Sequence, residues 1–380
     1  MLKTIAFIFL FQTMGVSFAQ NESNKVYKRI ALDALENNNE VMFYKGQPYT
    51  GVTFDMFENK TKRQELWWKD GLLNGTKTEY FEGGMVVRAK MNFEMGKRQG
   101  AFINFYPNGK TKLAGKYYYD LLDSTINAFY ETGTPKYTYH YEKGVKNGYT
   151  ITYYPNGNIE QKVNVINDAP QGFMKKFYEA GNIRLEAFYT QGVRNGMYYS
   201  YHITGQIAEE SYFKNGLQDS ISRYYDNVFG TLMKVEFYKN GKKNGVQITY
   251  NELGDTTAVY NFMNDIKEGA YKKYVANNMN IRKKGLFVKK KKRIYKGYVK
   301  GLDETGFYIN GVLDGEFKTG LTNKEYHAEG FYTMGKITGE WKYFDIKGKV
   351  VLHEKYDETG ELIYQKPKLK TASDEEKDSN

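Results

Sequence analysis

The stretch YEKGVKNGYTITYYPNGNIEQKVNV, residues 141–165, decides the fold. Tyr149 to Tyr154 is dense in aromatic and β-branched residues, which favour β-strands. Pro155-Asn156-Gly157 predicts a turn, because proline presets the first turn angle, asparagine tolerates the bend and glycine supplies the closing positive φ. Asn158 to Ile166 is expected to return as a second strand. The stretch therefore predicts a β-hairpin.

Glycines with the spacing of this hairpin recur across most of the chain. A first series has members 24 residues apart with one-residue slips: Gly84, Gly109, Gly133, Gly157, Gly181, Gly205, Gly230 and Gly254. A second series stands nine residues before the first, with small deviations: Gly75, Gly100, Ser124, Gly148, Gly172, Gly196, Ser220, Gly245 and Gly269. A third stands four residues earlier again: Gly71, Gly96, Asp120, Gly144, Asp168, Gly192, Gly216, Gly241 and Asp265. A fixed period indicates a repeat protein, here of about a dozen 24-residue hairpin units.

Aromatic residues keep the same period. Those four residues before a first-series glycine are called the repeat aromatics: Tyr80, Phe105, Phe129, Tyr153, Phe177, Tyr201 and Tyr250. Because side chains alternate along a strand, Tyr149, Ile151 and Tyr153 are expected to share one face. Repetition would stack such rings into ladders that stabilise a sheet without a large core. The repeat aromatics are therefore candidates for self-packing or for binding, with self-packing as their main role.

The pattern resembles the MORN-repeat family, specifically the bacterial MORN-variant repeats with their Tyr-x2-Gly-x3-Gly and Tyr-x2-Asn-Gly signatures. Tyr141 to Gly148 and Tyr153 to Gly157 match those signatures. The resemblance runs from Gly46 to about Phe262 and returns at residues 311–315 and 335–339. It implies an all-β fold, an elongated single-layer sheet of hairpins that acts as an interaction platform. Some relatives carry an antitoxin label, an alternative ranked lower because an export signal fits poorly with neutralising a cytoplasmic toxin.

Composition narrows the class of protein. The chain has 38 glycines, 36 tyrosines and 24 phenylalanines but only 6 prolines, and 41% of it is hydrophobic, so it is expected to fold. It has no cysteine, which excludes disulfides, thiol catalysis and a lipobox. Lys3, an apolar run from Ile5 to Phe11 and Ser17-Phe18-Ala19 read as a cleaved signal peptide. The product is thus expected to be exported, to the periplasm, the surface or the medium, with no transmembrane segment after signal cleavage.

These features divide the chain into six segments. Residues 1–19 are the expected signal peptide, 20–40 an N-terminal cap, 41–274 the repeat array, 275–305 a basic degenerate repeat or loop, 306–365 further repeats and 366–380 a disordered tail. A short helical spacing within the cap is formed by Ile30, Leu32, Ala34 and Leu35. A cap is needed because an exposed end strand pairs readily with other chains.

The segment 275–305 holds the densest positive charge of a chain whose formal net charge is +11. Ten basic residues lie there without an acidic one between them, including the cluster Lys289, Lys290, Lys291, Lys292 and Arg293. The cluster is a candidate site for an anionic lipid or glycan, whereas nucleic acid is disfavoured for an exported protein. The plainer interpretation, and the favoured one, is a solvated extended loop.

Nothing in the sequence indicates catalysis. The four histidines, His140, His202, His327 and His353, have no metal-ligand spacing, and the glycine pairs separate strands rather than cradling a phosphate. His202 stands where other units carry tyrosine, so it reads as a repeat substitution. No cofactor or metal is expected. The leading hypothesis is a non-enzymatic scaffold that binds a protein partner, and the alternative is an envelope-associated module that binds anionic lipid or glycan through the basic cluster.

Overall fold

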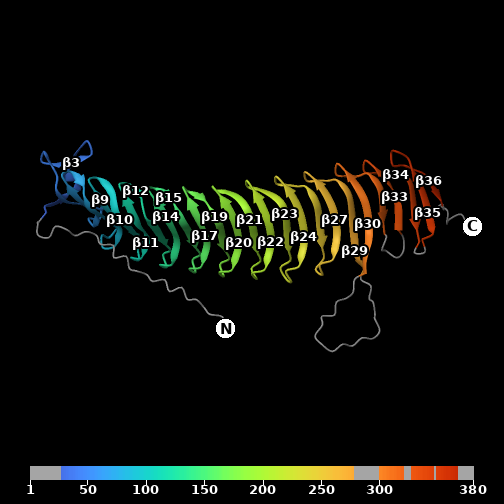
Figure 1. The fold of residues 1–380 in the computed structure, drawn as a ribbon. Coiled ribbons are helices and arrows are strands. Elements are labelled where there is room, and N and C mark those ends of the chain that lie inside the picture. Colours follow the sequence, from blue (N-terminus) through green and yellow to red (C-terminus); the bar gives the residue numbers. More distant parts are fainter. Residues whose placement is uncertain (1–26, 278–298, 321–326, 346–347, 367–380) are drawn as a thin grey trace, which may run out of the picture. The chain divides into compact units, whose positions relative to one another are not determined.

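The computed structural model describes residues 27–277, 299–320, 327–345 and 348–366 (Figure 1). It divides into two compact units, the first ending at Asn182 but including Tyr189–Gly192, and the second comprising Ile183–Phe188 and the residues from Val193 onward. Each unit is a layer of antiparallel β-hairpins, and the described residues contain no α-helix. The predicted fold class, an all-β single-layer sheet of hairpin repeats, is confirmed.

Two-residue strands recur among the long strands in both units. The elements of the first unit are β1 (Arg29–Ala31), η1 (Leu32–Ala34), β2 (Glu36–Asn38), β3 (Val41–Tyr44), β4 (Gln47–Pro48), β5 (Gly51–Met56), β6 (Lys62–Lys69), β7 (Leu72–Leu73), β8 (Gly75–Tyr80), β9 (Val87–Glu94), β10 (Lys97–Phe105), β11 (Thr111–Tyr118), β12 (Leu121–Leu122), β13 (Thr125–Phe129), β14 (Pro135–Glu142), β15 (Val145–Lys146), β16 (Gly148–Tyr153), β17 (Ile159–Ile166), β18 (Ala169–Pro170) and β19 (Gly172–Phe177).

The strand β20 (Ile183–Thr190) has residues in both units. The second unit continues with β21 (Val193–Tyr201), β22 (Ile207–Lys214), β23 (Leu217–Tyr225), β24 (Leu232–Lys239), β25 (Lys242–Lys243), β26 (Gly245–Tyr250), β27 (Thr256–Met263), β28 (Ile266–Lys267), β29 (Gly269–Asn277), β30 (Val299–Ile309), β31 (Val312–Leu313), β32 (Gly315–Thr319), β33 (His327–Thr333), β34 (Lys336–Phe344), β35 (Val350–Tyr356) and β36 (Leu362–Lys366).

The first glycine series closes the turn inside each hairpin. Between β16 and β17 the Tyr154 amide donates to the Asn158 carbonyl at 2.8 Å, and the Gly157 amide donates to the Tyr154 carbonyl at 2.9 Å. Gly157 has φ +91°, as a three-residue hairpin loop that ends in a left-handed residue requires. The predicted role of the Pro-Asn-Gly step is confirmed.

The third glycine series lies in a second, tighter turn that joins one hairpin to the next. Lys143 and Gly144 both have positive φ, 49° and 84°, which defines a type I′ turn. The Gly144 amide donates to the Leu122 carbonyl of the preceding repeat at 2.7 Å, so each turn is bonded to the one before it.

Three aspartates replace glycine in that turn because they add a bond that glycine cannot make. Asp168 adopts φ 63°, and its Oδ1 accepts the backbone amide of Lys146 at 3.0 Å. Asp120 accepts the Arg98 amide in the same way at 2.9 Å. The side chain thus offsets the strain of a left-handed residue with a second link to the preceding turn.

The N-terminal segment folds onto the first hairpin without an α-helix. β1 pairs in parallel with β5, η1 is a single 3-10 turn, and β2, β3 and β4 form a separate small sheet. Ile30, Tyr49, Leu66 and Trp68 form a buried cluster under it. The residues with helical spacing in this segment therefore form a strand and a 3-10 turn rather than an α-helix. Their apolar side chains cover the first hairpin.

The described strands can be set beside the expected segments. β29 and β30 pair from Gly269↔Tyr308 to Asn277↔Val299, so both ends of the segment 275–305, expected as a basic degenerate repeat or loop, are strand. Lys366, expected in the tail, pairs with His353 as the last residue of β36. The expected signal peptide, residues 278–298 and residues 367–380 lie outside the described part of the chain. No helix among the described residues is long and apolar enough to cross a membrane.

Candidate binding surface

The hairpins present two different faces. Thr150 pairs with Val163, and the next residues along, Tyr149 and Asn164, pair with their side chains on the opposite side. We call the Thr150 side the ladder face and the Tyr149 side the open face. Thr150 and Val163 are buried, whereas Tyr149 is 59% exposed, so the two faces differ in burial within one hairpin.

The ladder face is where aromatic rings contact one another. In the first unit, Phe102 and Tyr117 lie 4.9 Å apart between ring centroids. In the second unit, Tyr271 stacks on Tyr260 at 5.5 Å, and Trp341 contacts both Phe317 and Tyr332, among others. Such cross-strand pairs stabilise a sheet that has no second layer. Aromatic rings thus do pair across strands, but on the face opposite Tyr149 rather than on the Tyr149 side where the ladders were expected, and mostly at positions other than the repeat aromatics.

Glycines inside strands make room for these rings. Phe102 pairs with Gly115, Tyr271 with Gly306, and Gly330 lies under Trp341. None of these three glycines has the positive φ of a turn. A Cβ atom on Gly306 would lie 2.7 Å from Cε1 of Tyr271, and one on Gly330 would overlap the Trp341 ring. The missing side chain, rather than backbone freedom, is what the fold requires at these three places.

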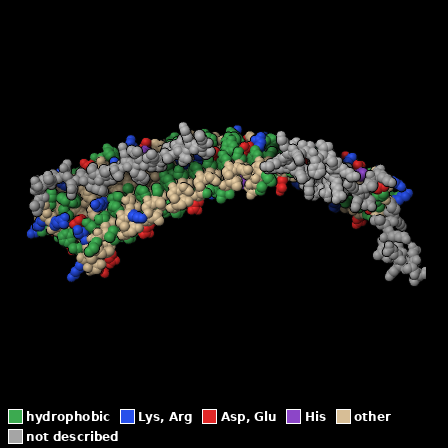
Figure 2. Space-filling model, turned by 90° about the horizontal axis from the view of Figure 1, so that it is seen from below, with side chains coloured by type: hydrophobic (Ala, Val, Ile, Leu, Met, Phe, Trp, Pro, Cys, Tyr) green, Lys and Arg blue, Asp and Glu red, His purple; other side chains and the backbone are tan. Residues whose placement is uncertain are grey.

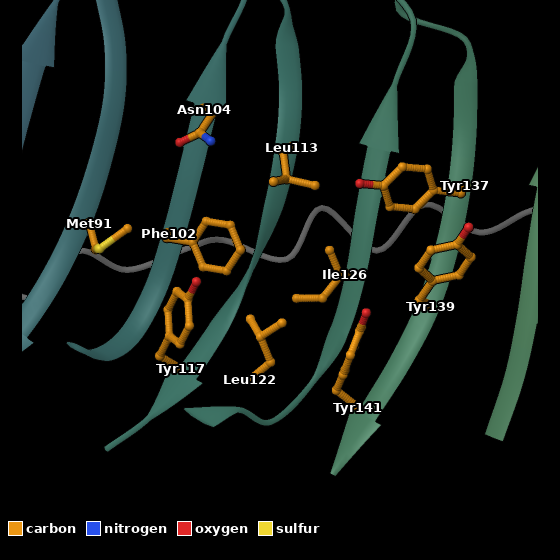
Figure 3. Close-up of a pocket in the computed structure, with 10 residues that line it drawn as sticks. All are labelled: Met91, Phe102, Asn104, Leu113, Tyr117, Leu122, Ile126, Tyr137, Tyr139 and Tyr141. Carbon is orange, nitrogen blue, oxygen red and sulfur yellow. The ribbon is translucent and has the colours of Figure 1, made fainter. Parts of the chain in front are cut away.

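A hollow of about 250 Å³ interrupts the ladder face of the first unit (Figure 3). The rings of Phe102, Tyr117, Tyr137, Tyr139 and Tyr141 line it, together with the Asn104 amide and aliphatic side chains that include Ile126. The side chains come from β9 to β14, across neighbouring hairpins. In Figure 3 the hydroxyl groups of Tyr137 and Tyr141 face the middle of the hollow, where Ile126 lies. The ladder face therefore has a concave, aromatic-lined site in this unit.

Cations lie over the rings of the hollow. The Arg98 guanidinium is 4.3 Å from the Tyr117 ring centroid, and its Nε donates to Asp120 at 3.0 Å. The Lys146 ammonium is 4.1 Å from the Tyr139 ring centroid. Burial raises the pKa of Tyr139 and Tyr141 above the usual tyrosine value, so both hydroxyls remain protonated and can donate hydrogen bonds at neutral pH.

In the second unit the ladder face holds carboxylates instead. Glu236 is 2% exposed, and its oxygens lie 3.2 Å from Lys234 Nζ, 2.8 Å from Lys243 Nζ and 2.8 Å from the Tyr238 hydroxyl. Burial disfavours ionisation, but the hydrogen bonds and charges of Lys243, Tyr238 and Lys234 outweigh it and lower the pKa of Glu236.

Two other glutamates of this face are held in the same manner. Glu304 accepts from Tyr271 at 2.6 Å and Lys273 at 2.8 Å, and Glu354 accepts from Tyr356 at 2.7 Å. Burial followed by the Glu354 contact raises the pKa of Tyr356. These carboxylates are engaged with neighbouring side chains of the sheet, which identifies them as structural cross-links.

The open face leaves large apolar side chains in solvent. In the first unit these include Trp67, Tyr149 and Phe173. In the second they include Met197, Tyr212, Phe237, Phe307 and Phe331. Figure 2, seen from below, shows hydrophobic side chains at the surface with charged side chains among them.

The second glycine series fits this face. A Cβ on Gly75 would lie 3.1 Å from Cβ of Trp67, and one on Gly245 would lie 3.2 Å from Cβ of Phe237. Both glycines also have positive φ, 115° and 116°. Glycine at these positions therefore allows the positive φ of the backbone and leaves space beside the exposed rings.

The repeat aromatics occupy one slot at the end of the first strand in successive hairpins, and all seven are half-buried. The Tyr80 hydroxyl donates to Glu65 and that of Tyr201 to Glu186, both at 3.2 Å. The carbonyl groups of Phe129, Tyr153 and Phe177 each accept a tyrosine hydroxyl from the preceding turn at 2.8 Å. These contacts fit the structural role expected of them, and whether they also bind a partner stays a prediction.

The other predicted residues give a mixed account. The basic cluster Lys289 to Arg293 lies outside the described residues. Among the described residues, no three His, Asp or Glu side chains converge as metal ligands.

Sequence reasoning missed the hollow and the exposed rings of the open face. The alternation Tyr137-x-Tyr139-x-Tyr141 indicates one tyrosine-rich face. The depth of the hollow, however, depends on Gly115, which is distant from these tyrosines in the sequence.

The fold and its two faces define a single-layer β-hairpin repeat protein with candidate binding surfaces. No protein-family model matches the sequence, and no curated protein matches it. The chain is similar to a crystal structure of TcdB2-TccC3-TEV, with 10% identity and a TM-score of 0.15 over 86% of this chain and 19% of that chain. A crystal structure of TcdB2-TccC3-Cdc42 gives 10% identity and 0.14 over 87% and 21%. The chain spans about a fifth of the length of either, and TM-scores this low define no shared fold.

Proposed function

We propose that this protein is an exported, non-enzymatic MORN-like repeat scaffold that binds a protein partner through its open face. The observation that carries the proposal is the set of exposed rings on that face. Tyr149 and Phe331 are 59% and 51% exposed, and Tyr212 and Phe237 are also exposed. Contiguous exposed apolar groups mark interaction sites, and on this face Tyr212 lies opposite the exposed Met197 of the neighbouring strand.

The contrast with the ladder face supports this choice of surface. Ladder-face rings such as Tyr271 and Trp341 are 2% and 3% exposed and contact other rings, so they already stabilise the sheet. Tyrosine and phenylalanine bury a large area on binding at a small loss of rotamer freedom, and tyrosine is enriched in interface cores. The glycine and aromatic pattern that resembles MORN-variant repeats, and the signal-like N-terminus, supply the class and the exported setting of the proposal.

The test is affinity capture from native cell-envelope extract with three baits. They are the wild-type chain, a Tyr212→Ser/Phe237→Ser double variant on the open face and, as a matched control, Lys318→Ser/Lys342→Ser on the same face. The scaffold proposal expects one protein to be retained by the wild type and the lysine control at high salt and lost by the Tyr212/Phe237 variant. Retention by all three baits would place binding elsewhere.

Salt separates this proposal from the alternative of an anionic lipid or glycan held by the basic cluster. A charge-driven contact weakens as ionic strength rises, while an aromatic contact persists. A fourth bait with Lys289 to Lys292 neutralised therefore keeps a protein partner under the scaffold proposal. Capture of lipid or anionic polymer that is lost with salt, or with those lysines, would favour the alternative instead.

A further inference from the structure

We propose that the hollow on the ladder face of the first unit is a saccharide-binding site that holds one pyranose ring of a glycan. The hollow has a volume of about 250 Å³, slightly below the ~300 Å³ at which sites for drug-sized ligands begin, which suits a single ring group. It lies on the side of the sheet opposite the exposed rings of the open face. The inference therefore goes beyond the proposed protein-binding function and does not depend on it.

The hydroxyl groups of the hollow are the first argument. Tyr117, Tyr137, Tyr139 and Tyr141 line it, and within the described chain none of their hydroxyls has a hydrogen-bond partner, nor has the side chain of Asn104. Elsewhere on this face tyrosine hydroxyls are engaged, those of Tyr238, Tyr271 and Tyr356 by glutamates. None of these groups is a buried atom without a partner, so they are open to solvent and can pair with a ligand in place of water.

The walls of the hollow are the second argument. The rings of Tyr137 and Tyr139 are stacked, with centroids 4.4 Å apart and planes 15° apart, and the Lys146 ammonium lies over Tyr139, so the flat wall is the face that Tyr137 turns away from Tyr139. Phe102 and Ile126, both 5% exposed, form the apolar floor. A pyranose ring has flat C–H faces and hydroxyls around its edge, so it matches aromatic walls edged by hydroxyl groups. Tyrosine offers both kinds of contact, an apolar body and a hydroxyl that both donates and accepts.

The charged side chains around the hollow indicate which kinds of saccharide it can bind. No carboxylate lines the hollow, Arg98 is held by Asp120, and the Lys146 ammonium forms no ion pair with a described carboxylate. Lys146 can therefore pair with the carboxylate of a uronic acid, while the tyrosines and Asn104 bind neutral sugars. The pyranose ring is the common recognition element, and neutral and acidic glycans are separate arms of the test.

The test measures binding of soluble tetrasaccharides to the full chain by calorimetric titration: cellotetraose, chitotetraose and tetragalacturonic acid. Decaproline serves as a fourth probe because proline-rich peptides also bind aromatic grooves. The variant is Tyr137→Phe/Tyr141→Phe, which keeps both rings and removes two hydroxyls. The matched control is Tyr149→Phe, which removes a hydroxyl from the open face.

At least one saccharide is expected to bind, and the double variant is expected to bind it at least about tenfold more weakly, as the loss of two hydrogen bonds predicts. Tyr149→Phe is expected to bind as the wild type does. Lys146→Gln is expected to weaken only the acidic sugar. The site assignment is overturned if no saccharide binds, if only decaproline binds, or if the double variant and Tyr149→Phe have the same affinity. Circular dichroism checks that each variant is folded, and Asn104→Ala provides a second variant at the same site.

Discussion

The Nε2 atom of His202 lies 3.1 Å from the carbonyl oxygen of Tyr225, in the place where Tyr106, Tyr130 and Tyr154 each donate a hydroxyl to the next repeat. A carbonyl only accepts, so His202 must carry its proton on Nε2. The interpretation of His202 as a repeat substitution, made from its position alone, agrees with this geometry.

Changing His202 to tyrosine is therefore expected to stabilise the protein. A tyrosine in this slot replaces the 3.1 Å bond of His202 with one of the 2.8 Å kind seen in the other repeats, so the expected gain in unfolding free energy is only part of the roughly 0.5–1.5 kcal/mol of a whole hydrogen bond. Urea unfolding of wild type and variant measures the difference. The reverse change, Tyr154→His, is the control and should lower stability, so a shift of both variants in the same direction would contradict the assignment.

Asp168 tests how the turns are linked. Asp168→Ala removes the bond to the Lys146 amide and places alanine in a left-handed conformation, so we expect a loss of about 1–3 kcal/mol. Asp168→Asn keeps an acceptor oxygen and tolerates that conformation, so its unfolding free energy should stay within about 0.5 kcal/mol of wild type. Equal losses for the two variants would show that the side-chain bond contributes nothing.

Gly330 tests whether strand glycines exist to seat aromatic rings. A Cβ at this position would overlap the ring of Trp341, so Gly330→Ala is expected to lower the unfolding free energy by about 1–3 kcal/mol. A double-mutant cycle with Trp341→Leu is the check, because the alanine should be tolerated better once the ring is gone. Additive losses in the cycle would mean that the ring is not the obstacle.

Glu236 gives the sheet a pH dependence of known sign. Its folded-state pKa is lowered, so its stabilising contribution is present above the unfolded-state value of about 4.3 and is lost as pH falls through the folded-state pKa. Glu236→Gln is therefore expected to be less stable than wild type at pH 7, and the gap should narrow below about pH 4. Chemical unfolding at both pH values measures it, with the exposed Glu340→Gln as control. A gap that widens on acidification would refute the sign.

The sequence predicts where the turns lie better than it predicts which face of the sheet packs and which stays exposed. Gly157 and its series locate the hairpins from β8 to β27, because turn conformations are local and glycine readily adopts the positive φ that these turns need. The ends of the hairpin around residues 278–298 were harder to locate, because the pairing of Lys273 with Glu304 joins residues that no local signal connects.

The site was less predictable for a related reason. Alternation along the strand shows that Tyr149 and Ile151 lie on the same face, but it does not show on which face the side chains pack against one another. The packing face depends on cross-strand partners, such as Gly115, which lies opposite Phe102 although it is thirteen residues away in the sequence. It also depends on whether the neighbouring side chain on that face is a glutamate or a lysine. The third-series aspartates were recognised as substitutions, while their role as acceptors required the position of the preceding turn.

The central claim, that the open face binds a protein partner, is tested most directly by photo-crosslinking from single sites. A photoreactive phenylalanine analogue replaces Tyr212 or Phe237 on the open face, or Tyr260 on the ladder face of the same unit, and each protein is irradiated in cell-envelope extract. The account predicts that the two open-face sites capture the same protein and that the Tyr260 site does not. Capture from Tyr260 alone, or of unrelated proteins from Tyr212 and Phe237, would contradict it.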